Sequence, residues 1–379
     1  MTAAKTKPGE GRTAADAGRE APLLPLELGR SAPEVLERLV AIGQQAGASD
    51  LHLQMTPTGV DVMFRLDGVM KKMTALPADL GSLCLGRIKY LAKLKTYQDS
   101  LPQEGRVAAG DVGSRSDIRV STYPTVLGEK IVLRLFPETV LKSLEELRFP
   151  EKARLALERF LLNSAGMLLL TGPAGSGKTT TIYACLQFLA GRGRHIITVE
   201  DPVEQVVPSV MQTEVNVDGG LTYAKAAKHL MRQDPEILVI GEIRDHETAT
   251  VAVQAALTGH MVIATLHGGS CCRVIERLSL MNGDVYSVLS SLELVINQRL
   301  VRVLCPDCHG RGCEACLQAR YRGRVPVVEW LTIDEAARKA LREGGPNAVM
   351  PAEELREAGR RLVDAGLTDE AEYARVFGT

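Results

Sequence analysis

The segment that most constrains this chain is Gly172-Pro173-Ala174-Gly175-Ser176-Gly177-Lys178-Thr179. It follows the apolar residues 167–170 and precedes an amphipathic stretch at 179–189, so it joins an expected strand to an expected helix. Glycines at this spacing let backbone amides converge on phosphates, and the N-terminus of the helix favours the same negative charge. A glycine-rich turn with an incidental lysine is the alternative, which the agreement of motif and context disfavours. The segment predicts a chain that binds a nucleoside triphosphate.

We expect ATP, with Lys178 at its terminal phosphates and Mg²⁺ ligated by the hydroxyl of Thr179. The expected nucleotide-binding residues are Gly172, Pro173, Ala174, Gly175, Ser176, Gly177, Lys178, Thr179 and Thr180.

Composition narrows the class of protein. With 379 residues, of which 45% are apolar and 24% charged, the chain can form two or three domains with their own cores. A net charge of −1 gives no overall attraction to nucleic acid or anionic lipid. Neither a signal peptide nor an apolar run of membrane-spanning length occurs, so we expect a cytoplasmic protein that reaches a membrane through a partner.

Four of the eight cysteines form two closely spaced pairs, Cys305-x2-Cys308 and Cys313-x2-Cys316. Four thiolates at this spacing can hold one tetrahedral Zn²⁺, which stabilises a segment too short to have a core. His309 is a possible substitute ligand. Disulfides or unligated thiols are the alternative, which a cytosolic chain disfavours. We therefore predict a structural zinc knuckle at 305–316.

Periodicity divides the chain into segments. Residues 1–30 are rich in Ala, Gly, Pro and charge without periodicity, and we expect a disordered tail. Residues 31–137 are expected to form an α/β domain, and 138–150 a linker with a short helical piece. The expected elements of this domain are helices at 33–46 and 78–95 and strands at 49–53, 60–66, 117–122 and 130–136.

Residues 151–379 alternate helices with short apolar strands, which predicts a mainly parallel sheet wound with helices. The phosphate loop then lies at the carboxyl end of the first of these strands. The expected strands are 166–171, 195–200, 236–241 and 261–266. The part at 332–379 is expected to be helical, with helices at 332–342, 351–365 and 369–376 that cap the domain or contact a neighbour.

Acidic residues and a histidine follow the other expected strands. Glu242 follows one buried strand, with Gly241 where many such enzymes place a metal-binding aspartate, so we assign Glu242 to polarising the attacking water. Glu200 ends another strand and is expected to assist, although its cluster is as often a turn containing proline. His267 is expected on the nucleotide side of the sheet, but by spacing alone a structural role is more frequent.

Taken together, these motifs resemble those of the motor ATPases of type II secretion and type IV pilus systems. The resemblance covers roughly residues 33–379 and includes further segments in the N-terminal half. The principal matching segments are the phosphate loop, Ile197-Thr198-Val199-Glu200-Asp201-Pro202-Val203-Glu204 (aspartate box), Gly241-Glu242-Ile243-Arg244-Asp245 (atypical Walker B), Thr258-Gly259-His260 to Thr265-Leu266-His267 (histidine box) and the cysteine knuckle.

The resemblance implies a homohexameric ring of subunits, each with an N-terminal α/β, PAS-like domain and a RecA-like ATPase domain. It implies that arginines complete the ATP site across the cleft, and Arg119 and Arg134 lie in the matching strands. Alternation puts Arg134 opposite to the apolar face of its strand, but spacing alone favours a surface ion pair there.

The function that we expect is Mg²⁺-dependent ATP hydrolysis that moves an inner-membrane platform protein during secretion or pilus assembly. The expected catalytic residues are Glu242, Glu200, Lys178, Arg119, Arg134 and His267. A pilus-retraction ATPase is the alternative in the same class. A nucleic-acid motor is a further alternative, against which the neutral charge and 4% aromatic content argue.

The sequence departs from the family pattern at three places. Gly268-Gly269-Ser270 replaces the usual Thr-Asn-Asp or Thr-Asn-Glu after the second histidine. The halves of the knuckle are separated by fewer residues than is common. About 30 residues precede the first expected helix, so we expect a compact form without an additional N-terminal domain.

Overall fold

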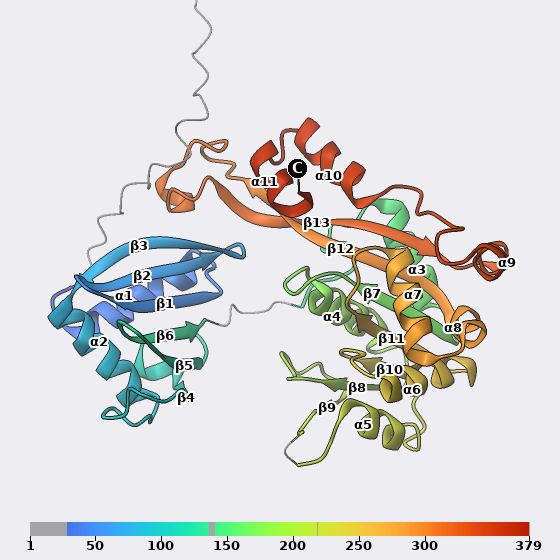
Figure 1. Cartoon of the computed structure of the whole chain (residues 1–379), viewed down its shortest axis with the longest axis horizontal. Helices are drawn as coiled ribbons and strands as arrows, with labels where there is room; N and C mark the ends of the chain where they lie inside the picture. Colours follow the sequence, from blue (N-terminus) through green and yellow to red (C-terminus); the bar gives the residue numbers. More distant parts are fainter. Residues whose placement is uncertain (1–28, 136–140, 218, 379) are drawn as a thin grey trace, which may run out of the picture. The chain divides into compact units, whose positions relative to one another are not determined.

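The computed structural model describes residues 29–135, 141–217 and 219–378. The expected disordered tail lies outside these residues except for its last two positions, and so do residues 138–140 of the expected linker. The chain divides into two compact units, one comprising residues 1–137 with 311–320 and the other 138–310 with 321–379. Each unit has its own sheet, and Figure 1 labels the elements.

The N-terminal unit contains a six-stranded sheet in the order β3-β2-β1-β6-β5-β4. All of its strand pairs are antiparallel. Alternate residues of β2 and β5 are buried, as expected for a sheet that packs on helices through one face. The elements are α1 (Ala32–Gln45), β1 (Asp50–Thr56), β2 (Gly59–Leu66), β3 (Val69–Pro77), α2 (Ala78–Leu91), β4 (Gln103–Val107), a 3-10 turn (Ala109–Asp111), β5 (Ile118–Thr125) and β6 (Gly128–Arg134).

Local signals begin and end these elements. Ser31 and Glu34 form a capping box at the N-terminus of α1. Asp67 and Gly68 both have positive φ, at 48° and 85°, and make the tight turn between β2 and β3. The expected hairpin signal therefore corresponds to a real turn, which leads into a strand that the sequence pattern did not predict.

The second unit is a seven-stranded sheet in the order β13-β12-β7-β11-β10-β8-β9. All pairs are parallel except β12 with β13. The strands are β7 (Gly166–Thr171), β8 (Ile196–Glu200), β9 (Met211–Glu214), β10 (Ile237–Ile240), β11 (Met261–Leu266), β12 (Leu292–Leu304) and β13 (Tyr321–Thr332). The helices are α3 (Glu151–Leu161), α4 (Lys178–Leu189), α5 (Tyr223–Leu230), α6 (His246–Leu257), α7 (Cys271–Asn282), α8 (Val285–Ser291), α9 (Glu335–Gly344), α10 (Leu355–Asp364) and α11 (Glu370–Phe377).

Helices cover both faces of this sheet. Met167 and Leu169 of β7 belong to one core, which includes side chains of α5, α6 and α7. Leu168 and Leu170 belong to the other core, with side chains of α3 and α4. Alternate residues of one strand therefore enter different cores, which explains why the strand reads as a continuous apolar run. In this arrangement the carboxyl ends of the parallel strands share one edge, where ligands bind in open α/β sheets.

Among the residues that the structure describes, no helix combines the length and the apolar character needed to cross a membrane.

Candidate functional site

The phosphate loop connects β7 to α4, as the sequence predicts. Gly177 is the N-cap of α4 in a left-handed conformation (φ 92°), and no side chain caps the helix. The first amides of α4 are therefore not used by a cap and suit an anion at the end of a helix dipole. The hydroxyl of Ser176, inside the loop, is buried and has no hydrogen-bond partner. These features fit a phosphate ligand.

Lys178, the first residue of α4, folds back over the loop. Its Nζ donates to the carbonyls of Gly172 (2.9 Å) and Pro173 (3.0 Å). Burial lowers the pKa of Lys178, and the negative charge of Glu242 opposes this shift. The ammonium is thus close to both the loop and the expected catalytic carboxylate.

Glu242 and His267 lie together at the ends of the neighbouring strands β10 and β11. Nε2 of His267 is 2.9 Å from Oε1 of Glu242. Nδ1 of the same ring is 3.1 Å from the carbonyl oxygen of Gly172. The second oxygen of Glu242 accepts from Nε of Arg244 at 2.6 Å. The expected base, the expected histidine and the phosphate loop therefore form one connected group.

Glu200 is 6% exposed at the end of β8, and both of its oxygens accept hydrogen bonds within the unit. Oε2 accepts from the hydroxyl of Tyr183 at 2.6 Å. Oε1 accepts from Thr198 (2.6 Å) and Gln212 (3.0 Å). Burial, together with the hydrogen bond to Glu200, raises the pKa of Tyr183. The carboxylate thus anchors α4 and β9 to the end of β8.

Arg119 and Arg134 lie in the N-terminal unit, directly opposite each other in the register of β5 and β6. Both are on the exposed face of their strands. Nε of Arg134 is 3.1 Å from Oδ1 of Asp50, although 64% of the arginine side chain is exposed. The ion pair that spacing alone favoured is present, with a buried partner, and it leaves most of the arginine side chain exposed.

The four cysteines of the knuckle come together: one Sγ from each of Cys305, Cys308, Cys313 and Cys316 lies within 4.8 Å of the others. The Sγ atoms of Cys313 and Cys316 are 3.7 Å apart. This matches the edge of a tetrahedron with Zn–S bonds of about 2.3 Å. No cysteine of the described residues is in a disulfide. The donor set and the spacing therefore fit one zinc ion.

The altered segment after His267 is well packed. A Cβ on Gly268 would lie 3.0 Å from Oγ1 of Thr171 and from Cβ of Val274, so a larger residue would crowd both. Ser270 is the N-cap of α7 and accepts from the backbone N–H of Arg273 at 3.2 Å. The departure from the family pattern is thus compatible with an ordered loop.

Three consecutive polar residues on β12 contact the site but were not predicted from the sequence: Asn297, Gln298 and Arg299. Nδ2 of Asn297 donates to the carbonyl of Gly269 (3.0 Å), and Nε2 of Gln298 donates to that of Ser176 (2.8 Å). Arg299 donates to Asn297 and to the backbone of Gln298. Three consecutive polar residues inside an otherwise apolar strand were the signal that could have identified them.

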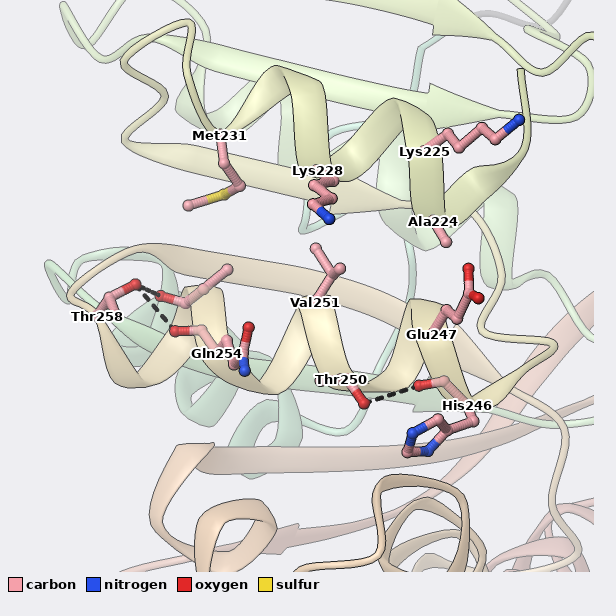
Figure 2. Close-up of a pocket in the computed structure, with 11 residues that line it drawn as sticks. Ala224, Lys225, Lys228, Met231, His246, Glu247, Thr250, Val251, Gln254 and Thr258 are labelled. Atoms are coloured by element: carbon pink, nitrogen blue, oxygen red, sulfur yellow. Dashed lines mark hydrogen bonds between the residues drawn. The ribbon is translucent and has the colours of Figure 1, made fainter. Parts of the chain in front are cut away.

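A separate groove of about 630 Å³ lies between α5 and α6, away from the phosphate loop. Figure 2 shows Lys228 of α5 and Met231, the residue that follows this helix, pointing across it toward α6, where Val251 lies. None of the site residues expected from the sequence lines this groove.

Comparison with known proteins places these features in context. The family model described as "Type II/IV secretion system protein" matches residues 30–375. The chain is 38% identical to type II secretion system protein E of Pseudomonas aeruginosa, over 87% of this chain and 72% of that protein. It is 35% identical to the type IV pilus assembly ATPase TfpB of Acinetobacter baylyi, over 90% of this chain and 65% of that protein.

Two solved structures have the same fold. The Legionella pneumophila ATPase DotB superposes with a TM-score of 0.73 at 23% identity, covering 94% of this chain and 99% of DotB. The ADP-bound pilus retraction motor PilT gives a TM-score of 0.64 at 24% identity, covering 90% of this chain and 96% of PilT. The second unit therefore has the expected RecA-like ATPase fold, and the mixed α/β class is confirmed.

Proposed function

Since this chain belongs to the type II/IV secretion system protein family, a family of secretion ATPases, we propose that it hydrolyses ATP in an Mg²⁺-dependent reaction to power secretion or pilus assembly. Membership in this family supports ATPase activity in general. We further propose that the activity depends on magnesium, that the chain assembles into a ring, and that the ring drives a secretion or pilus machine.

The observation that carries the proposal is the group formed by the phosphate loop, Glu242 and His267. An uncapped helix N-terminus, which suits phosphate, lies beside a carboxylate that is only 19% exposed and is bonded to an imidazole. A carboxylate in this place can orient a water molecule for in-line attack on a terminal phosphate.

We assign roles to this chain's residues as follows. Lys178 neutralises charge on the terminal phosphates, and Thr179 would hold Mg²⁺, which when bound polarises phosphoryl oxygens. Glu242 orients the water and takes its proton. His267 faces one acceptor at each ring nitrogen, so a neutral ring donates to only one of them at a time. A change in the hydrogen bond to Glu242 therefore changes the hydrogen bond to the carbonyl of Gly172. Glu200 assists by holding Tyr183 and Gln212 in place.

Arg119 and Arg134 are proposed to stabilise the charge that develops in the transition state, in a homohexamer whose subunits complete one another's sites. The mostly exposed side chain of Arg134 supports this role, because an arginine that binds a phosphate must be accessible to it. Zinc at Cys305, Cys308, Cys313 and Cys316 is proposed to be structural, since four thiolates leave no open position.

The partner that we propose is an inner-membrane platform protein, with the ATPase at the cytoplasmic face. The named relatives at 35–38% identity are secretion and pilus assembly proteins, which supports assembly rather than retraction. The similarity to PilT concerns the fold and does not discriminate between the two directions.

The test is steady-state ATP hydrolysis by the full chain with and without Mg²⁺, alongside Lys178→Ala and Glu242→Gln, with the oligomer mass recorded in the same samples. We expect turnover that needs Mg²⁺, comes from a six-subunit species and is lost in both variants. A wild type that binds ATP but hydrolyses it no faster than the variants, even as a ring, would overturn the assignment of Glu242.

A further inference from the structure

The carboxamide of Gln298 is buried against the phosphate loop. Gln298 is 1% exposed on β12, the strand next to β7. Its Nε2 donates to the carbonyl of Ser176 at 2.8 Å, and its Oε1 accepts from the hydroxyl of Thr181 at 3.1 Å. One side chain therefore bonds both the last turn of the loop and the first turns of α4.

The backbone of the loop also packs closely on this residue. A Cβ on Gly172 would lie 2.4 Å from the backbone oxygen of Gln298, and one on Gly177 would lie 3.0 Å from its Nε2. Two glycines of the phosphate-binding motif thus pack closely on β12 and also have positive φ values, 142° and 92°. The loop is fitted to β12 at both of its ends.

This arrangement matters for binding because a phosphate loop acts through the positions of its backbone amides. Lys178 and His267 both contact the carbonyl of Gly172, at 2.9 and 3.1 Å. A shift of the loop away from β12 would therefore disturb the contacts of the lysine and the histidine with Gly172 as well as the positions of the amides. Pre-organisation of this kind lowers the cost of binding, since the ligand need not order the loop.

The geometry points to Gln298 as a positioning residue that holds the phosphate loop in the conformation that binds nucleotide, and through Gly172 keeps Lys178 and His267 aligned. This inference rests on the proposed function, because it concerns how the same site binds ATP. It differs from a purely structural role, in which loss of the carboxamide would lower the stability of the fold and leave the affinity of the folded protein unchanged.

The experiment measures the Kd of a fluorescent N-methylanthraniloyl ATP for the full chain, and KM and kcat for ATP. The variants are Gln298→Leu, which keeps the volume and removes both bonds, Thr181→Val, which removes the hydroxyl that bonds Gln298 and has the carbonyl of Gly177 as its other acceptor, and the double variant. Gln44→Leu is the matched control, because Gln44 donates a part-buried bond to Ser114 in the other unit. The thermal midpoint without nucleotide is recorded for each.

We expect Gln298→Leu to raise Kd and KM about tenfold, the effect of losing one or two buried hydrogen bonds. Thr181→Val is expected to raise both less, and the double variant to raise them by less than the product of the single effects, because both remove a shared bond. If Gln298→Leu fails to fold, Thr181→Val still tests the bond between Thr181 and Gln298. Gln44→Leu is expected to change the midpoint alone.

Two results would overturn the inference while the wild type binds and hydrolyses ATP. One is a Kd within twofold of wild type in both Gln298→Leu and Thr181→Val. The other is an equal loss of affinity in Gln44→Leu, which would indicate general destabilisation. A wild type that does not bind the fluorescent nucleotide overturns the proposed function itself and, with it, this inference.

Discussion

Nε2 of His267 lies 2.9 Å from Oε1 of Glu242, so the ends of two neighbouring parallel strands are joined by a side-chain contact. The same imidazole reaches the carbonyl of Gly172 with its other nitrogen. Glu242, expected to touch the attacking water, is therefore tied to the loop expected to hold the phosphates. Hydrolysis at one end of this contact can change the hydrogen bonds at the other.

His267→Asn is expected to lower kcat about tenfold to a hundredfold while Kd for ATP changes by less than threefold, because Glu242 loses the group that orients it. His229→Asn is the control, since His229 is exposed on α5. The measurement is steady-state hydrolysis together with nucleotide binding. An unchanged kcat in His267→Asn would show that this histidine is structural and does not orient Glu242.

Arg119→Ala and Arg134→Ala are each expected to reduce kcat about a thousandfold with little change in ATP binding, as for arginines that act on the transition state. Arg38→Ala, at an exposed position of α1, is the control for removing a positive charge from the same unit. Mixing either variant with Lys178→Ala tests for sites shared between subunits, since partial recovery of turnover requires residues from two chains. No recovery, with ring size unchanged, would contradict completion of the site by a neighbour.

The cysteine knuckle is expected to contain one zinc ion per chain, measured by elemental analysis of purified protein. Cys308→Ser is expected to lose it and to lower the thermal midpoint, because the metal contributes folding free energy to a segment without a core of its own. Cys84→Ala should keep the zinc, since Cys84 lies in the N-terminal core, where burial raises its pKa to about 11. Wild-type protein without zinc after purification in metal-replete buffer would contradict the prediction.

The ion pairs of Glu372 are expected to make the stability of the protein depend on pH. It is fully buried on α11 and pairs with Arg302 of β12 (2.7 Å) and Arg375 (2.6 Å). Burial raises the pKa of Glu372, but the hydrogen bonds from Arg375 and Arg302 outweigh it, and the net pKa lies below its usual value of 4.5. This contribution to stability is present above pH 4.5 and is lost as the pH falls through the lowered pKa.

Glu372→Gln is accordingly expected to reduce the free energy of unfolding by about 3 kcal/mol at pH 7, the typical cost of removing one partner of a buried ion pair, here the partner of the largely buried Arg302. The difference from wild type should shrink as the pH falls below 4.5. Denaturant unfolding at several pH values measures it, and Glu370→Gln on the exposed start of α11 is the control. A difference that stays constant down to pH 3 would show that the charge of Glu372 does not contribute.

The sequence predicted those parts of the molecule whose residues lie close together along the chain. The phosphate loop, α4 and the strands β7, β8, β10 and β11 each carry their own periodicity or motif, and all were expected. The four-stranded core of the second sheet followed from these short apolar runs. The strand β3 was missed because its burial is irregular, and β9 because three of its four residues are polar and none of the four is buried.

Contacts between segments that lie far apart in the sequence could not be predicted from the periodicity of the sequence. The bond between Gln298 and Ser176 joins residues 122 positions apart, and it depends on β12 pairing with β7, which no local signal announces. Glu200 illustrates a different limit. Its position at the end of a strand was expected. The donors to its two oxygens were not, because Tyr183 lies in α4 and Gln212 in β9, and only Thr198 belongs to the same strand.

The contacts that β12 makes on both of its faces constrain the number of residues in this strand. Asn297 and Arg299 face one side of this strand and Gln298 the other, and Cys305 follows directly after the strand ends at Leu304. Because the side chains of a strand alternate with a period of two, one residue inserted or deleted between Leu294 and Gln298, after the irregularity in its pairing with β7, would exchange the two faces. Substitutions within β12 can be compensated one at a time, but a change in its residue count would disturb the phosphate loop and the loop after His267 at once. Natural variation in this strand should therefore occur through replacement of residues and leave their number unchanged.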